Sequence, residues 1–203
     1  MRKIAVLCAA SLFLISCVGI DSRLTIRDNG SGTLALTYRV SQLVANLGIS
    51  SSEKGAIPLP LTRSDFERSL ESSKGAVRLT RFDRSENEKD ITIIAELSFD
   101  SLEALSQVEA FRAQDIKIGT SGQGRTFSEL IARAPGRPVT EESLKMIDAF
   151  FSGYDLTFTI EAPRPIQQNS LGTLSDDKRV LKYSTTVKDL VRAKSDVILT
   201  FGW

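Results

Sequence analysis

Apolar and polar side chains alternate along several stretches of this chain, as they do in strands that bury one face. Leu24 and Ile26 alternate with polar neighbours, the segment 28–32 (Asp-Asn-Gly-Ser-Gly) follows, and the alternation resumes from Leu34 to Val40. Asn and Gly tolerate the positive φ angles that a tight turn requires. The pattern therefore predicts a β-hairpin near the start of the chain.

Further alternating stretches predict a sheet. Val77 and Leu79 indicate a third strand, and the charged stretch from Arg84 to Asp90 is expected to form the loop of a second hairpin. The other apolar faces are Ile91, Ile93, Ala95, Leu97 and Phe99; Tyr154, Leu156, Phe158, Ile160 and Ala162; Leu181 and Tyr183; and Val197, Leu199, Phe201 and Trp203. Half-buried strands of this kind favour a mainly antiparallel sheet with one face in water.

Helical spacing occurs between these strands. Asp100 and Glu103 have the spacing of a capping box and open an apolar stripe at Leu102, Leu105, Val108 and Phe111. A second helix is expected from Thr140, with Leu144, Ile147 and Phe151 facing inward and Gly153 ending it. A weaker helix is expected over 64–72, stopped by Gly75, and a short turn over 41–47. The predicted fold class is α+β, a mainly antiparallel sheet with two to three helices packed on one face in two layers.

The first seventeen residues have the pattern of an export signal. A basic start at Arg2 and Lys3 precedes an apolar run over 4–14. That run is shorter than the ~20 residues of a membrane-spanning helix. The run ends at Ser16 and Cys17, which resembles the lipobox of bacterial lipoproteins. That resemblance implies cleavage before Cys17 and lipidation of its thiol, giving a signal peptide over 1–16 and one domain over 17–203. The alternatives are an ordinary secretory signal, or a buried N-terminal strand with an incidental cysteine.

Acyl chains on Cys17 would anchor the protein, because each buried methylene contributes ~0.8 kcal/mol. Cys8 is removed with the signal, so the mature chain retains one cysteine and forms no intrachain disulfide. In enteric bacteria an Asp after the acylated cysteine retains a lipoprotein at the inner membrane. Val18 stands there in this chain, which favours the outer membrane over the inner one. Only Val18 to Ile20 separate Cys17 from the first strand, so we expect the domain to lie close to the lipid headgroups.

Composition excludes several classes of chemistry. The 203 residues include 26 Lys and Arg, 25 Asp and Glu, and no His. Without His the chain has no Ser-His-Asp triad, no Cys-His pair and no His-ligated zinc. A net charge of +1 argues against nucleic acid as a partner. We predict no cofactor and no metal.

Short motifs give no catalytic assignment. Ser51 with Lys54, and Ser175 with Lys178, match Ser-x-x-Lys, but the Ser and Lys content of the chain makes such matches expected by chance. The segment 119–124 is rich in glycine yet lacks a phosphate-loop pattern, and we interpret it as a flexible loop before an edge strand. The carboxylate pairs 141–142 and 176–177 fit the first turn of a helix and a turn before a strand. No catalytic residue is predicted.

Two proline-bearing loops carry arginines that are candidates for ligand binding. Arg133 and Arg137 lie in the first loop, which precedes the second predicted helix, and Arg164 lies in the second, over 162–169. Guanidinium groups on stiff loops suit phosphate or sugar-acid headgroups. The alternative is that the prolines only end strands and the arginines only keep the loops hydrated.

The order of these elements resembles the LppM-type lipoprotein domain of mycobacterial envelope proteins. The resemblance lies in Cys17, the hairpin over 23–32, the segment 99–101, and the closing stretch from 158–163 through Tyr183 and Asp189 to Trp203. It implies an envelope protein of mixed α and β structure without known catalytic residues, and a role in binding lipids or glycolipids.

These observations predict a non-enzymatic lipoprotein, anchored to a membrane, that binds a lipid, a glycolipid or another envelope component. The alternative is a structural or assembly protein that docks onto an outer-membrane protein complex. A hydrolase based on Asp and Glu is a third class, because that chemistry needs no His.

Overall fold

The computed structural model describes residues 18–42, 60–122 and 124–203. The predicted signal peptide, Cys17, the Ser51–Lys54 motif and most of the turn expected over 41–47 lie outside these residues. The strands are β1 (Val18–Ile26), β2 (Gly32–Ser41), β3 (Val77–Glu86), β4 (Asp90–Phe99), β5 (Lys117–Ser121), β6 (Gly124–Ala132), β7 (Asp155–Glu161), β8 (Gln168–Asn169), β9 (Thr173–Leu174), β10 (Val180–Thr186) and β11 (Val197–Gly202). The helices are α3 (Arg63–Leu70), α4 (Leu102–Ser106), α5 (Glu141–Phe151) and α6 (Val187–Arg192), with 3-10 turns η2 (Glu71–Ser73) and η3 (Glu109–Gln114).

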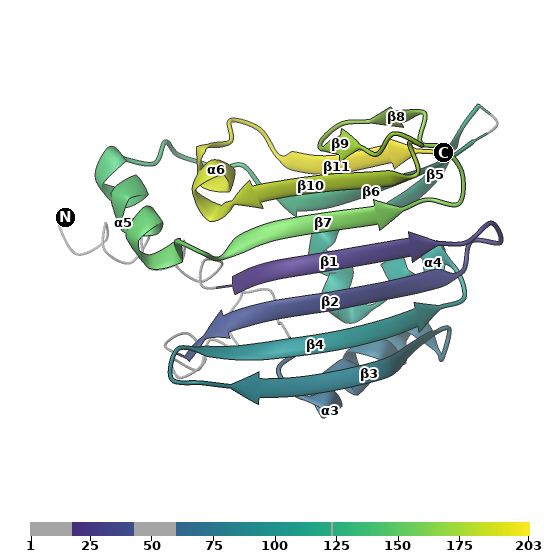
Figure 1. Ribbon diagram of the computed structural model, residues 1–203, viewed down its shortest axis with the longest axis horizontal. Helices are drawn as coiled ribbons and strands as arrows, with labels where there is room; N and C mark the ends of the chain where they lie inside the picture. Colours follow the sequence, from purple (N-terminus) through teal and green to yellow (C-terminus); the bar gives the residue numbers. More distant parts are fainter. Residues whose placement is uncertain (1–17, 43–59, 123) are drawn as a thin grey trace.

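Seven strands form the larger sheet, in the order β3-β4-β2-β1-β7-β10-β9 (Figure 1). β1 and β2 form the predicted hairpin, paired from Val18 opposite Val40 to Ile26 opposite Gly32. β1 is the central strand, and its other edge pairs with β7 in parallel. This parallel pair joins segments more than 130 residues apart in an otherwise antiparallel sheet, which strand patterning alone does not predict.

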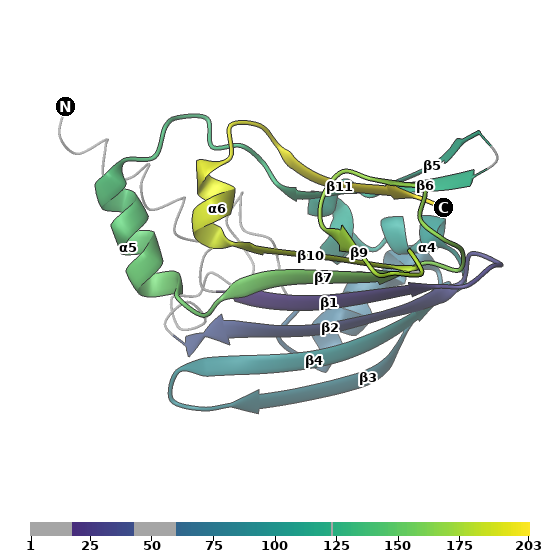
Figure 2. The ribbon, with the colours of Figure 1, turned by 45° about the horizontal axis from the view of Figure 1, so that its top comes forward.

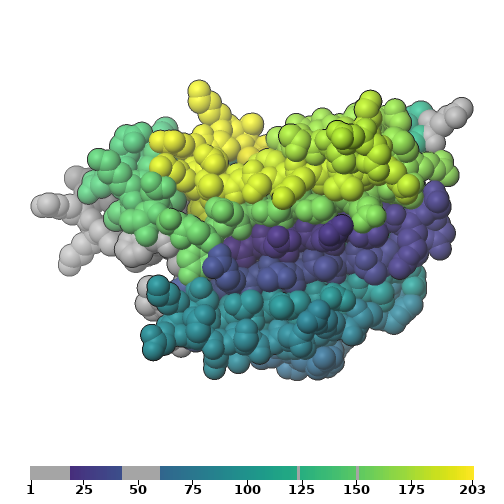
Figure 3. Space-filling view, viewed as in Figure 1, coloured from purple at the N-terminus to yellow at the C-terminus, as the bar shows by residue number. Residues whose placement is uncertain are grey.

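Alternation along the strands gives the larger sheet a buried and an exposed face. Ile93, Leu97 and Leu181 are completely buried on the inner face. The outer face carries small polar and charged side chains such as Arg23 and Thr37, and Figure 3 shows it open across the width of the molecule. The predicted wet face is therefore present.

A second sheet, in the order β5-β6-β11-β8, covers part of the inner face together with α3 and α4 (Figure 2). Leu199 and Phe201 on β11 are completely buried and belong to the same core cluster as the inner face of the larger sheet. The α+β class, mainly antiparallel, is thus confirmed, with a second sheet added to the covering layer.

The helices begin where hydroxyl side chains cap them. Thr140 caps α5 by accepting a hydrogen bond from the backbone nitrogen of Ser143, as the sequence predicts. α3 and η2 occupy the weaker predicted helix, and Lys74 and Gly75 follow with positive φ. The capping box expected at Asp100 is wrong. Ser101 caps α4, while Asp100 accepts hydrogen bonds from Arg78 at 2.7 and 3.2 Å.

Strands extend into two predicted loops. The second hairpin is present, but its loop is shorter than predicted, because β3 continues to Glu86 and β4 begins at Asp90. Arg84 and Glu86 therefore lie in an edge strand, where charged side chains discourage pairing with another chain. Likewise Gly119 lies within β5, which pairs with β6 as far as Ser121 opposite Gly124. Among the described residues, no helix has the length and apolar character needed to cross a membrane.

Candidate functional site

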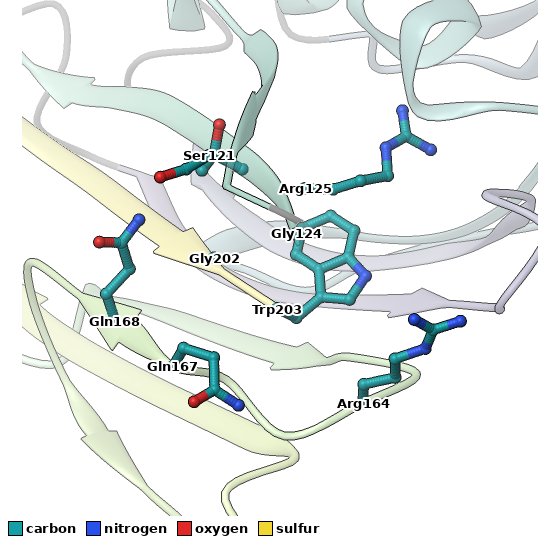
Figure 4. Close-up of a pocket in the computed structure, with 9 residues that line it drawn as sticks. Ser121, Gly124, Arg125, Arg164, Gln167, Gln168, Gly202 and Trp203 are labelled. Atoms are coloured by element: carbon teal, nitrogen blue, oxygen red, sulfur yellow. The ribbon is translucent and has the colours of Figure 1, made fainter.

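A cavity of about 370 Å³ opens at the end of the second sheet where β6 begins and β11 ends (Figure 4). Among its lining residues are Ser121, Arg125, Arg164, Gln167, Gln168 and Trp203. Gly124, Thr126 and Gly202 complete the described lining. We call this cavity the distal pocket, and its side chains come from three separate parts of the sequence.

Arg125 and Trp203 lie directly opposite each other where β6 and β11 run side by side. The backbone nitrogen of Arg125 donates to the carbonyl of Trp203 at 2.9 Å, and the nitrogen of Trp203 donates back at 3.0 Å. This exchange extends the β6–β11 ladder by one residue pair, so the two side chains project from the same face. Phe201 lies two residues before Trp203, with the ring centroids 5.3 Å apart and nearly stacked. The indole of Trp203 therefore packs against the buried ring of Phe201, and it is itself half-buried.

Two glycines let the walls of the distal pocket approach closely. A Cβ at Gly202 would lie 3.0 Å from the side-chain nitrogen of Gln168, and one at Gly124 would lie 2.6 Å from the carbonyl oxygen of Trp203. Side chains at these positions would move the amide or the ladder that shapes the pocket.

The loop after β7 holds Arg164 between buried residues. Ala162 and Ile166 are both 1% exposed, and each donates its backbone nitrogen to the segment before β10. Pro163 and Pro165 fix φ on either side of Arg164. The backbone that carries the guanidinium of Arg164 is therefore held in place on both sides, and the sequence predicts a stiff loop here.

Ion pairs balance the charge around the distal pocket. Arg125 pairs with Glu103 of α4, and Arg164 pairs with Asp28 of the β1–β2 turn at 3.3 Å. The two positive charges of the pocket are therefore each paired with one carboxylate. A guanidinium carries five N–H donors, and Arg164 uses only Nε for its pair within the described chain. Its terminal nitrogens remain available to a ligand.

The amide side chains add both donors and acceptors. Gln167 donates to the carbonyl of Pro165 at 3.1 Å, which leaves its own side-chain oxygen as an acceptor. The side chain of Gln168 makes no hydrogen bond to the described part of the chain, so its oxygen and nitrogen are both open to a ligand. A pocket with amides, guanidinium donors and an indole suits a hydroxyl-rich ligand.

The structure separates the other candidate arginines from this pocket. Arg133 lies just after β6 and pairs with Asp196 at 3.8 Å, at the opposite end of the β6–β11 ladder. Arg137 is exposed and makes no ion pair with a described residue. The two proline-bearing loops therefore do not contribute to one site.

The remaining motifs lie in ordinary structural positions. Ser175 and Lys178 form the turn between β9 and β10, where the Ser175 hydroxyl donates to Asp177 at 2.5 Å. Glu141 and Glu142 occupy the first turn of α5, as predicted from the helix dipole. The segment 176–177 is a turn before β10, also as predicted.

One half-buried acid has no counterpart in the sequence predictions. Glu129 lies on the inner face of β6, opposite the completely buried Leu199 and two residues from Phe127. It makes no ion pair or hydrogen bond with the described residues, and burial raises the pKa of its carboxyl to about 7. An unpaired acid on an apolar face is unfavourable for folding when it is charged.

Comparisons with known proteins give a similarity in structure. The sequence matches no known family model and no curated protein. Among solved structures, the chain is similar to the NMR structure of the folded domain of Mycobacterium tuberculosis LppM, with 11% identity and a TM-score of 0.47. The similarity covers 94% of this chain and 91% of that one. These values do not place the chain in that protein's family, and the resemblance stated from the sequence stays a prediction.

The sequence predicts one residue of the distal pocket, Arg164, from its place between two prolines, and it does not predict the other lining residues. Arg125 and Trp203 belong to strands whose pairing joins residues far apart in the chain, so no local pattern reveals them. Trp203 carried a weak signal, as the last member of an apolar alternation that extends beyond the buried Phe201.

Proposed function

We propose that this protein is a bacterial envelope lipoprotein, anchored by lipids on Cys17, whose domain binds a hydroxyl-rich envelope component in the distal pocket. The observation that carries the proposal is the lining itself. The half-buried indole of Trp203, the amides of Gln167 and Gln168, and the free donors of Arg164 surround one cavity of about 370 Å³. Sugar units of a glycolipid or a glycan present the matching hydroxyl groups and apolar ring faces.

The charge balance favours a neutral or weakly charged ligand. Glu103 and Asp28 already neutralise the two guanidinium groups, so a multiply charged anion would meet two carboxylates near the pocket. A hydroxyl-rich ligand can instead accept from the free nitrogens of Arg164 and leave both ion pairs intact. We therefore propose binding to a glycan moiety rather than to free phosphate.

Binding is proposed in preference to hydrolysis because of what lines the cavity. The described lining residues include no carboxylate, thiol or imidazole. The two neighbouring carboxylates are both held in ion pairs with arginines. The alternative of docking onto an envelope protein complex predicts a flat apolar patch, whereas the large apolar side chains that are exposed in the described chain are Met146 and Ile198 alone.

The test is native mass spectrometry of the lipidated protein purified in mild detergent from its own host. The proposal predicts a retained sugar-containing adduct on the wild type and its loss from Arg164→Ala. Arg133→Ala is the matched control, because both arginines are exposed to a similar degree (70% and 73%) and both form surface ion pairs. Adducts of equal abundance on all three proteins, or none on the wild type, would contradict the proposal.

A further inference from the structure

β1 connects the predicted lipidation site at one end of the domain with the distal pocket at the other. β1 begins at Val18, one peptide bond after the predicted lipidation site, so the paired sheet starts directly after that site. At its other end β1 enters the β1–β2 turn. Asp28 of that turn pairs with Arg164, and a Cβ on Gly30 would lie 2.8 Å from a guanidinium nitrogen of Arg125.

β1 is a rigid connection between these two ends. It is paired over its full length with β2 and over six residues with β7. A strand advances about 3.3 Å per residue, so its nine residues separate Cys17 from the β1–β2 turn by roughly 26 Å or more. Because β1 is the central strand of the larger sheet, this distance is fixed by the core and not by a loop.

The end of the domain next to Cys17 carries an apolar contact for a membrane. α5 ends beside the start of β1, where a Cβ on Gly19 would lie 3.3 Å from Cα of Tyr154 and Arg39 donates to the carbonyl of Gly153. Figure 1 shows α5 beyond the starting ends of β1 and β7, at the opposite end of the molecule from the C-terminus. Met146 of α5 is 40% exposed, a large apolar side chain at the end that lipids on Cys17 would hold against the bilayer.

The outer face of the larger sheet is less suited to lie on lipid. Asp21, Arg23 and Thr37 are exposed on its central strands, beside Glu161, which pairs with Arg23 at 3.6 Å. Lying on that face would place the charged central strands of the sheet on the bilayer. Standing on the α5 end places Met146 there instead, and the exposed Glu142, Lys145 and Asp148 of the same helix would lie among the lipid headgroups.

Resting on the proposed function, we infer that the domain stands end-on at the membrane and that the distal pocket faces away from it, to take a glycan chain of the cell wall and not a headgroup of the anchoring leaflet. Such a ligand reaches the pocket from the aqueous side. The free donors of Arg164, the amides and the indole are all presented toward that side.

Trp203 is the only tryptophan of the chain, so its emission reports on the pocket directly. The lipidated full-length protein is reconstituted in vesicles of phosphatidylethanolamine and phosphatidylglycerol that contain a headgroup-labelled nitroxide lipid. We expect the emission of Trp203 to equal that in unlabelled vesicles. A Met146→Trp variant in a Trp203→Phe background is the matched control, and we expect the nitroxide to quench it. Equal quenching of both reporters would overturn the orientation.

Soluble cell-wall glycan fragments are then added to the same vesicles. We expect them to change the emission of Trp203 with the same midpoint on vesicles as in detergent, and Arg164→Ala to raise that midpoint roughly tenfold through loss of hydrogen bonds to a charged donor. An unquenched Trp203 whose emission changes with neither the fragments nor glycolipid in the vesicles would contradict the proposed function, while the orientation stands. A response to glycolipid in the anchoring leaflet, but not to the fragments, would overturn the inference and leave the proposed function intact.

Discussion

The two proline-bearing loops have similar sequences and opposite surroundings. Each places arginine next to proline, yet the loop of Arg164 lies between buried residues beside the distal pocket. The loop of Arg133 leads from β6 to α5 at the other end of the molecule, where Asp196 pairs with that arginine. The same residue types therefore line the candidate site at one end and form a surface ion pair at the other.

The difference shows that the supporting strands, more than the loop itself, define a site. At the pocket end, β6 and β11 continue their ladder to Arg125 and Trp203, and the β1–β2 turn brings Asp28 alongside. At the end next to Cys17 the same two strands separate, and the loop connects to a helix. We therefore expect changes at the two ends to have separable effects on anchoring and on binding.

The largest expected effect is at the anchored end. Cys17→Ala removes the thiol that accepts the lipid, so we expect loss of membrane fractionation and accumulation of unprocessed precursor. Ligand binding by the detergent-free protein should be unchanged, because the pocket lies at the far end of β1. Recovery of this variant in the detergent phase would contradict the predicted anchor.

The core below the pocket gives the next effect. Phe201→Ala removes a completely buried ring that supports Trp203, and we expect the free energy of unfolding to fall by about 3–5 kcal/mol. Ile198→Ala, on the same strand but 43% exposed, should change it by about 0.5 kcal/mol. Urea denaturation followed by circular dichroism measures both. Equal losses would show that β11 is not part of the core.

A pair of glycines separates backbone strain from pocket geometry. Gly30 and Gly75 have φ angles of 83° and 85°, so Ala at either position should cost about 1–2 kcal/mol of stability. A Cβ at Gly30 would also contact the guanidinium of Arg125, whereas one at Gly75 meets nothing within 4 Å. We expect only Gly30→Ala to weaken binding of soluble glycan fragments, measured by Trp203 emission. Equal weakening by both would assign the effect to stability alone.

Glu129 gives an effect that depends on pH. Its pKa is raised from 4.5 to about 7, so the folded protein holds a proton that the unfolded chain has released. Stability from this group is therefore greatest below about pH 4.5 and is lost as the pH rises through 7. Glu129→Gln should be more stable relative to wild type at pH 8 than at pH 5, in urea denaturation at both values. The exposed Glu142→Gln is the control, and the same pH dependence in both variants would contradict a burial effect.

Local patterns predicted the elements that local forces form. The Asn29-Gly30 turn marks the first hairpin, alternation marks β4, and Thr140 marks the start of α5. β5 was missed because glycine and small polar residues replace the apolar alternation of a strand, and the end of β3 because charges occupy an edge. The parallel pairing of β1 with β7 depends on contacts across most of the chain.

The candidate site was predictable only in part for the same reason. The stiffness and charge of the Arg164 loop are local properties, and the sequence shows them. The partners of Arg164 in the pocket depend on the register of β6 with β11, which brings residues 125 and 203 together. A shift of that register by one residue would turn both side chains to the opposite face.

Hydrogen–deuterium exchange of the lipidated full-length protein, with and without soluble cell-wall glycan fragments, tests the central claim most directly because it compares the two ends in one experiment. The account predicts slower amide exchange in segments 124–126, 164–170 and 200–203, and unchanged exchange in segment 133–139. Slower exchange confined to segment 133–139, or no change at the distal pocket, would contradict it.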